Sequence, residues 1–346
     1  MTRSKTGSKF LRGGVNQLKL FTHSYDDIIS VENLLEAWKE FVKGKRRKAD
    51  VQDFQYRLME NILVLHRELK DGSYKHGGYK HFKISDPKPR DIHKATVRDR
   101  LLHHALYRQL YPHFDRRFIA DSFSCRRGKG THRAMDRFRA FAFKVSRNHR
   151  RSCYVLKCDI RKFFASIDQS VLMEILEKHI QDNRLLGLIK EVVGSFDSGL
   201  PGKGLPLGNL TSQLLVNIYM NEFDQFAKHE LRAKYYIRYA DDFVILSPDR
   251  QSLVKIFRLI ERFLRARLKL ELHPDKVFIK TFASGVDFLG WVHFPDHQVL
   301  RTATKRRMWR RVGESKTSPE VLVSYLGLLK HGNTYKLRQR FSVDFE

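Results

Sequence analysis

Two adjacent aspartates lie between two short apolar segments in Ile237-Arg-Tyr-Ala-Asp-Asp-Phe-Val-Ile245. Apolar, β-rich segments around a short polar centre predict a β-hairpin that carries the acids at its tip. Aspartate also favours turns through local hydrogen bonds, so the pair alone is equally typical of a solvated turn. A second segment, Cys153-Tyr-Val-Leu-Lys-Cys-Asp159, is typical of a strand and also ends in a carboxylate. A carboxylate at the end of a buried strand is costly unless it meets a cation.

Asp159, Asp241 and Asp242 can therefore lie together at the ends of neighbouring strands. Mg²⁺ prefers oxygen ligands from carboxylates together with substrate phosphates. Two ions bound in this way stabilise the attacking and leaving oxygens of a phosphoryl displacement. We expect the three carboxylates to bind two Mg²⁺ ions, with Mn²⁺ as an alternative.

The chain is strongly basic, because 66 Lys and Arg residues against 38 Asp and Glu give 346 residues a formal net charge of +28. Its composition is also 42% hydrophobic, which is enough for a packed core and excludes a disordered basic tail. The charge excludes an ordinary metabolic enzyme with a neutral surface. The expected partner is a polyanion, and nucleic acid comes first, because phosphate contacts dominate its affinity for proteins.

Cys125, Cys153 and Cys158 are odd in number and form no C-x-x-C pair. This pattern argues against a disulfide framework or a cysteine zinc site and fits a reducing compartment. The basic N-terminus lacks the apolar stretch of a signal peptide, and the apolar runs fall short of the roughly 20 residues that a membrane span needs. We expect a cytoplasmic protein without membrane contact.

Strand and helix patterns alternate irregularly along the chain, which predicts an α+β fold rather than regular βαβ units. The segment from 74 to 84 reads as a strand or hairpin region, closed by two prolines that hold the chain extended. Apolar spacing predicts helices over residues 31–41, 51–69, 95–110, 169–193, 209–231 and 253–270.

An ordered series of motifs resembles the reverse transcriptase family. Tyr239-Ala-Asp-Asp242 resembles its YxDD box, and Asp159-Ile-Arg-Lys-Phe-Phe164 resembles its first catalytic strand. The other matching segments are Lys88-Pro-Arg90 with 97–105 (first fingers motif), 124–134 (second fingers motif), 204–213 (loop facing template and nucleotide), 272–276 (later palm motif) and 288–291 (primer grip). The resemblance runs from about residue 75 to residue 295.

This resemblance implies a right-hand polymerase with fingers, an antiparallel palm sheet and a helical thumb. The expected limits are a basic N-terminal extension over 1–50, fingers over 51–152, palm over 153–296 and a short basic thumb over 297–346. The implied activity is RNA-directed DNA synthesis, with template RNA, the RNA/DNA hybrid and dNTPs as ligands.

The resemblance also implies roles for individual residues. Asp159, Asp241 and Asp242 are the catalytic residues, and Ile160 joins them among the metal-binding residues. Phe164 takes the place of the bulky ring that reverse transcriptases hold against the sugar of the incoming nucleotide, whereas Phe163 is equally typical of a core residue. The nucleotide-binding set is Lys88, Arg90, Arg126, Phe164, Gln213 and Lys276, and the primer grip is Phe288, Leu289, Gly290 and Trp291. For Lys276 the alternatives are a proton donor to pyrophosphate and a surface lysine.

The loop that carries Leu207, Gly208, Ser212 and Gln213 resembles one subfamily more closely. Most bacterial relatives have Gln before this glycine and Pro after the serine. An aliphatic residue and Gln at these two places resemble the reverse transcriptases of diversity-generating retroelements, within the group II intron-like family of bacteria and phages. The resemblance implies copying of a template RNA with errors at adenines, together with a small, basic, oligomeric accessory protein.

Two alternatives stay open. The first is a retron-type or abortive-infection (defence) reverse transcriptase, and the second is a catalytically idle RNA-binding scaffold. Intact acids at all three positions disfavour the scaffold, because clustered carboxylates are costly without a function. No nuclease, integrase or maturase segment is evident after residue 300, so we expect the enzyme to rely on other proteins.

Overall fold

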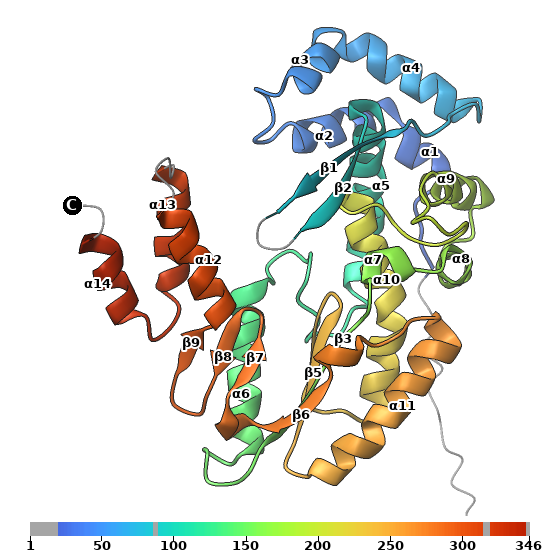
Figure 1. Ribbon diagram of the computed structural model, residues 1–346. Helices are drawn as coiled ribbons and strands as arrows, with labels where there is room; N and C mark the ends of the chain where they lie inside the picture. Colours follow the sequence, from blue (N-terminus) through green and yellow to red (C-terminus); the bar gives the residue numbers. More distant parts are fainter. Residues whose placement is uncertain (1–19, 86–88, 314–318, 344–346) are drawn as a thin grey trace, which may run out of the picture.

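The centre of the fold is a four-stranded antiparallel sheet (Figure 1). The computed structural model describes residues 20–85, 89–313 and 319–343. The strands are β3 (Tyr154–Asp159), β4 (Tyr236–Tyr239), β5 (Asp242–Ser247) and β6 (Phe278–Thr281), in the order β4-β5-β3-β6. The predicted hairpin is confirmed, because β4 and β5 pair around the two-residue turn Ala240-Asp241, where Ala240 has a φ of 55°.

Each face of this palm sheet packs against its own set of elements. Leu156, Cys158 and Phe243 join the core formed with α8 (Gln169–Glu177), α10 (Leu210–Gln225) and α11 (Arg250–Leu268). Val155 and Val244 face the other way, toward α6 (Thr131–Val145) and β7 (Val286–Phe288). Because side chains alternate along a strand, Asp159 and Asp242 belong to the α6 face.

Helix α6 lies within a stretch where lysine and arginine outnumber acids, and sequence analysis predicted no helix there. Its apolar residues recur at intervals of three and four, which buries one face of the helix. These buried residues are Ala134, Met135, Phe138, Phe141, Ala142 and Val145. The spacing was therefore the available signal for this helix.

The fingers pair a helical layer with a two-stranded hairpin, β1 (Tyr79–Ile84) and β2 (Arg90–Ala95). The helices are α1 (Tyr25–Ile29), α2 (Val31–Phe41), α3 (Ala49–Tyr56), α4 (Leu58–Lys70) and α5 (Val97–Asp115). The predicted helix over 31–41 is confirmed. Residues from Phe21 onward belong to the same core as the palm helices, within the stretch expected as an extension.

Two of the predicted helices are each divided in two. The helix over 51–69 breaks at Arg57, with φ −116° and ψ 42°, and the Asn61 side chain donates to the Phe54 carbonyl at 2.9 Å across the break. The helix over 169–193 is α8 followed by α9 (Asn183–Gly194), because the Asp182 side chain accepts from two backbone amides and starts a new helix. Helix α10 continues as a π-helical turn over Phe226–Glu230.

The C-terminal part combines a small antiparallel sheet with helices. The strands are β7, β8 (Trp291–His293) and β9 (Gln298–Leu300), followed by α12 (Thr302–Val312), α13 (Pro319–Leu329) and α14 (Tyr335–Val343). Trp291 packs with Leu300, Met308 and Leu329, and a Cβ at Gly332 would collide with its ring. The domain limits themselves remain a prediction. Among the described helices, none has the length and apolar character needed to cross a membrane.

One buried ion pair connects several of these elements. Arg238 of β4 and Asp224 of α10 have no exposed side-chain surface, and Nε and Nη2 of the arginine donate to the two carboxylate oxygens at 2.8 and 2.7 Å. The other guanidinium contacts are Asn217 Oδ1, Ser122 Oγ and the carbonyl of Ala240. Although burial acts to lower it, Asp224 holds the pKa of Arg238 above its usual value.

We predict that Arg238→Met lowers the free energy of unfolding by about 3–5 kcal/mol, because it leaves the Asp224 carboxylate buried without its cation. Urea unfolding followed by circular dichroism measures this loss. Arg184→Met is the matched control, since its pair with Asp26 is largely exposed and screened by solvent, so this variant is expected to unfold much like the wild type. Equal losses in the two variants would contradict the prediction.

Candidate active site

The three predicted carboxylates lie at one edge of the palm sheet. Asp159 ends β3 directly opposite Asp242, the first residue of β5. Asp241 belongs to the β4–β5 turn, and its carbonyl accepts a hydrogen bond of 3.2 Å from the backbone amide of buried Ile160. Two backbone connections, the β3–β5 ladder and this hydrogen bond, therefore hold the residues together.

The carboxylates are crowded and partly desolvated. Burial, together with the neighbouring negative charges of Asp241 and Asp159, raises the pKa of Asp242 to about 7 against the opposing effect of Lys157. Burial and then Asp159 raise the pKa of Asp241 as well, whereas Lys276 and Arg90 act to lower it. A site that disfavours its own negative charge in this way favours an added cation.

Two lysines already supply positive charge here. Lys276 Nζ donates to Asp159 Oδ1 at 2.8 Å, and Lys157 Nζ lies 3.4 Å from Asp242 Oδ2. Lys276 thus lies beside one of the three predicted catalytic carboxylates. Lys157 lies two residues before Asp159 on the same face of β3, and sequence analysis did not single it out.

The donor set fits divalent metal ions. Carboxylate oxygens are the ligands that Mg²⁺ prefers, and Asp242 Oδ1 is buried without a hydrogen-bond partner. Within the described ranges, no three His, Cys, Asp or Glu side chains already converge on one point, because two of the carboxylates pair with lysines instead. Asp159, Asp241 and Asp242 are the residues that would hold the ions.

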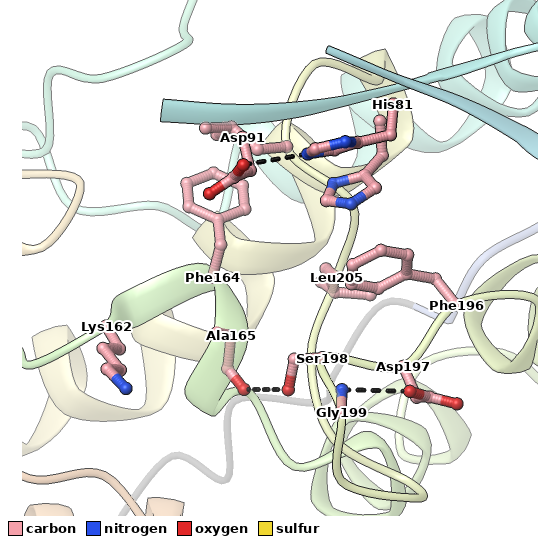
Figure 2. A pocket seen from close by; sticks show the side chains of 12 residues that line it. His81, Asp91, Lys162, Phe164, Ala165, Phe196, Asp197, Ser198, Gly199 and Leu205 are labelled. Carbon is pink, nitrogen blue, oxygen red and sulfur yellow. Dashed lines mark hydrogen bonds and ion pairs between the residues drawn. The ribbon is translucent and has the colours of Figure 1, made fainter. Parts of the chain in front are cut away.

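A cavity of about 570 Å³ lies between the fingers hairpin and the palm (Figure 2). Phe164 and Ala165 line it from α7 (Phe163–Ser166), and Phe196 and Leu205 line it from the loop that follows α9. Figure 2 shows the rings of Phe164 and Phe196 on either side of this cavity. Phe163 is 4% exposed and belongs to the core, whereas its neighbour Phe164 lines the cavity.

The hairpin contributes a polar wall to the same cavity. His81 Nε2 and Asp91 Oδ1 form a hydrogen bond of 2.8 Å across β1 and β2, which Figure 2 marks above Phe164. His93 also lines the cavity, with its ring 5.0 Å from that of His81. Sequence analysis missed these residues, because only the strand register brings them to one face of the hairpin.

The loop before α10 lies directly under the hairpin. The Leu207 carbonyl accepts from the His93 amide at 3.1 Å, and Leu207 lines the cavity with Phe164. Gly208 has a φ of 111°, and a Cβ there would come within 3.0 Å of the Ile92 side chain. Ser212 is buried at the start of α10.

Gln213 lines a second cavity, of about 370 Å³, on the other face of the hairpin. Phe82 and Ile92 form the hairpin side of this second cavity. Its cations are Lys45, Lys94 and Arg100, of which Lys94 and Arg100 share the carboxylate of Asp50. The structure thus separates Gln213 from Leu207, although both belong to the same predicted loop.

The basic residues of the predicted nucleotide site have different surroundings. Arg90 begins β2 and lies near enough to Asp241 for its charge to act on that carboxyl. Arg126 is 6% exposed, and its guanidinium contacts Asp115 at 2.7 Å and the carbonyls of Ile119 and Ser122. Lys88 lies outside the described residues.

The predicted primer grip forms the hairpin between β7 and β8. Phe288 and Trp291 are buried, whereas Leu289 and Gly290 form the turn with φ values of 53° and 87°. The backbone amide of Arg301 donates to the Gly290 carbonyl at 3.2 Å, which connects the turn to the start of α12. The turn of this motif is therefore half-buried, and Leu289 packs against the clusters on both sides of it.

Arg238 is the residue of greatest structural consequence that sequence analysis did not single out. The available signal was a charged residue inside an otherwise apolar strand, which requires a buried partner. Its contact with the Ala240 carbonyl reaches the turn that carries Asp241. The partner, Asp224, lies in α10, 14 residues before Arg238 in the chain.

The antiparallel palm sheet, the clustered carboxylates and the fingers hairpin are those of a right-hand polymerase. Residues 75–293 match the family described as reverse transcriptase (RNA-dependent DNA polymerase), and the chain belongs to this family. This part of the chain is therefore an RNA-directed DNA polymerase domain.

Individual relatives are distant. Protein YkfC of Escherichia coli is 27% identical over 292 residues, covering 72% of this chain and 74% of that protein. The group II intron-encoded protein LtrA of Lactococcus lactis is 23% identical over 318 residues, covering 72% of this chain and 51% of its own length. Telomerase from Candida albicans, solved with a fragment of telomeric RNA, has a TM-score of 0.47 at 13% identity, over 75% of this chain and 54% of that one. The chain thus spans about half the length of LtrA and of the telomerase.

We predict that millimolar Mg²⁺ or Mn²⁺ raises the thermal midpoint of the protein and that Asp241→Asn removes this shift. A ligand that binds only the folded state stabilises it, and each kcal/mol corresponds to roughly 2–4 °C for a domain of about this size. Differential scanning fluorimetry with and without the metal ion measures the shift. Asp53→Asn, on the exposed side of α3, is the control and keeps the full response. An equal shift in all three proteins would remove Asp241 from the ion site.

Proposed function

We propose that this protein extends a primer on an RNA template by adding deoxynucleotides. The primer 3′-hydroxyl attacks the α-phosphate of a dNTP, a new phosphodiester forms, and pyrophosphate leaves. The observation that carries the proposal is the group of three carboxylates that the β3–β5 ladder and the β4–β5 turn bring together at one edge of the palm sheet, in a chain of the reverse transcriptase family.

Each group of residues has a role in this proposal. Asp159, Asp241 and Asp242 hold Mg²⁺, which on binding stabilises the attacking and leaving oxygens. Arg90 and Lys276 bring positive charge toward the triphosphate, and their proximity to these carboxylates supports this role. The Phe164 ring excludes a 2′-hydroxyl, so that the product is DNA.

Arg126 and Lys88 are weaker parts of the proposed nucleotide site. Arg126 would have to exchange its contacts with Asp115 and two carbonyls for the triphosphate. Arg127, the next residue, is exposed and has its guanidinium 5.3 Å from the Tyr111 ring, which makes it a second cation in the same motif. The template RNA itself would contact the distributed positive charge of the chain.

We predict that Asp159→Asn or Asp241→Asn abolishes dNTP incorporation and leaves RNA affinity within about twofold of wild type. Metal-bound carboxylates serve the chemistry, whereas affinity for RNA comes from many lysine and arginine contacts. Primer extension on an RNA template and a filter-binding assay measure the two properties, with Asp53→Asn as the control. Near-normal extension by either variant would remove that residue from the site.

We further propose that the protein belongs to the reverse transcriptases of diversity-generating retroelements. The proposal is supported by Leu207, which lines the cavity beside Phe164 and offers no side-chain hydrogen bond there. The Leu207 carbonyl is already bonded to the hairpin. A template RNA and a small, basic, oligomeric accessory protein complete this proposal. Because this chain is itself highly basic, RNA would lie between the two proteins and screen their repulsion.

We predict misincorporation concentrated opposite template adenines and reduced about tenfold in Leu207→Gln. One hydrogen bond contributes about 0.5–1.5 kcal/mol, and about 1.4 kcal/mol changes a rate tenfold, so one restored polar contact is sufficient. Sequencing of cDNA made from a template RNA of mixed sequence measures the error spectrum. Leu63→Gln, at an exposed aliphatic residue of α4, is the control and is expected to leave the error spectrum unchanged. Errors spread evenly over the four bases, or rare everywhere, would favour the retron-type or defence alternative.

A further inference from the structure

The short helix that carries Phe164 is held by hydrogen bonds from a loop that is distant in the sequence. Helix α7 has four residues and ends at Ser166. The carbonyls around it accept from a loop far along the chain: Phe164 from the Leu205 amide at 2.9 Å, Ala165 from Ser198 Oγ at 2.8 Å, and Ile167 from the Gly204 amide at 2.8 Å. We name this loop, residues 195–205, the strap.

Gln169 ties the strap to the chain that leaves α7. Its Nε2 lies 3.1, 2.7 and 3.0 Å from the carbonyls of Val193, Phe196 and Gly204, so one amide group reaches both ends of the strap. The Gln169 backbone amide also donates to the Gly202 carbonyl at 3.0 Å.

Ser198 and Gly204 close the strap onto itself. The Ser198 amide donates to the Lys203 carbonyl at 2.9 Å. Gly204 has a φ of 99°, and a Cβ there would lie 2.7 Å from the Ser198 Cβ, so this crossing requires glycine. The Ser198 hydroxyl is left pointing at α7, and Figure 2 marks its bond to Ala165.

The other end of the strap contacts the fingers hairpin. The Phe196 ring lies 4.7 Å from His93 and 5.7 Å from Tyr79, with edge-to-face geometry in both contacts. Ser195 Oγ and the Tyr79 hydroxyl are 2.7 Å apart. The strap therefore joins the two walls of the cavity, the hairpin on one side and the Phe164 helix on the other.

We infer that the strap sets the position of the Phe164 ring, so that Ser198 and Gln169 act as positioning residues for sugar selection without touching the sugar. This inference rests on the proposed role of Phe164. Without the Ser198 hydroxyl, the Ala165 carbonyl loses its fixed donor and the ring next to it gains freedom to move away from a 2′-hydroxyl. The discrimination against ribonucleotides then falls although Phe164 is intact.

The test is single-nucleotide primer extension with the full chain, comparing kcat/KM for a ribonucleotide and the matching deoxynucleotide. Ser198→Ala and Gln169→Met are expected to raise the ratio of ribonucleotide to deoxynucleotide use by about three- to tenfold, the effect of one or two hydrogen bonds. The higher kcat/KM for the ribonucleotide is expected to come from a lower KM rather than from a higher kcat. Ser198→Thr keeps the hydroxyl and is expected to restore the wild-type ratio, whereas a purely structural role would change both nucleotides together.

Two further variants make the outcomes distinguishable. Phe164→Val reports the gate directly, and Ser170→Ala removes an exposed hydroxyl beside Gln169 and is expected to leave the ratio unchanged. If Phe164→Val raises the ratio and the strap variants do not, the inference is overturned and the proposed function stands. If Phe164→Val also leaves the ratio unchanged, the role of Phe164 and the inference fail together. Absence of extension by the wild-type protein with any nucleotide would instead overturn the proposed function.

Discussion

The fully buried pair of Arg238 and Asp224 is the interaction on which the geometry of the site depends. It joins β4, an edge strand of the palm sheet, to α10, and through the Ala240 carbonyl it reaches the turn that carries Asp241. Tyr236 adds a third polar group, since its hydroxyl donates to Asp224 at 2.6 Å. Burying such a network is costly unless every member is satisfied. The five guanidinium contacts meet this requirement and fix the β4–β5 hairpin against α10.

This rigidity matters because the carboxylates beside it repel one another. Burial and mutual charge disfavour ionised Asp241 and Asp242, whereas the positive charges of Lys157, Lys276 and Arg90 act in the opposite direction. A flexible turn would relax by moving the acids apart into solvent. The β3–β5 ladder and the contacts of Arg238 oppose this movement. The stability of the rest of the palm therefore offsets the repulsion among the three carboxylates until cations bind.

The sequence was sufficient for features that are local in the chain. The hairpin around Asp241 and Asp242 and the strand ending at Asp159 follow from short apolar segments, and the helix over 31–41 follows from its spacing. The break at Arg57 depends on a bond from Asn61, and the partner of Arg238 is chosen by the packing of α10, so neither follows from periodicity. The strap could not be predicted from the sequence, because its hydrogen bonds to α7 and Gln169 connect residues about 35 positions apart. Arg126 matched a motif, but only the fold reveals that Asp115 already occupies it.

The fingers hairpin has a different set of side chains on each face, and each face lines its own cavity. His81, Asp91 and His93 line the cavity beside Phe164, whereas Phe82, Ile92 and Lys94 line the cavity beside Gln213. Because the hairpin is a single layer of two strands, it forms a wall that the two cavities share. A tilt of the hairpin that narrowed one cavity would widen the other. A ligand in one cavity that displaced the hairpin would therefore change the volume of the other cavity as well.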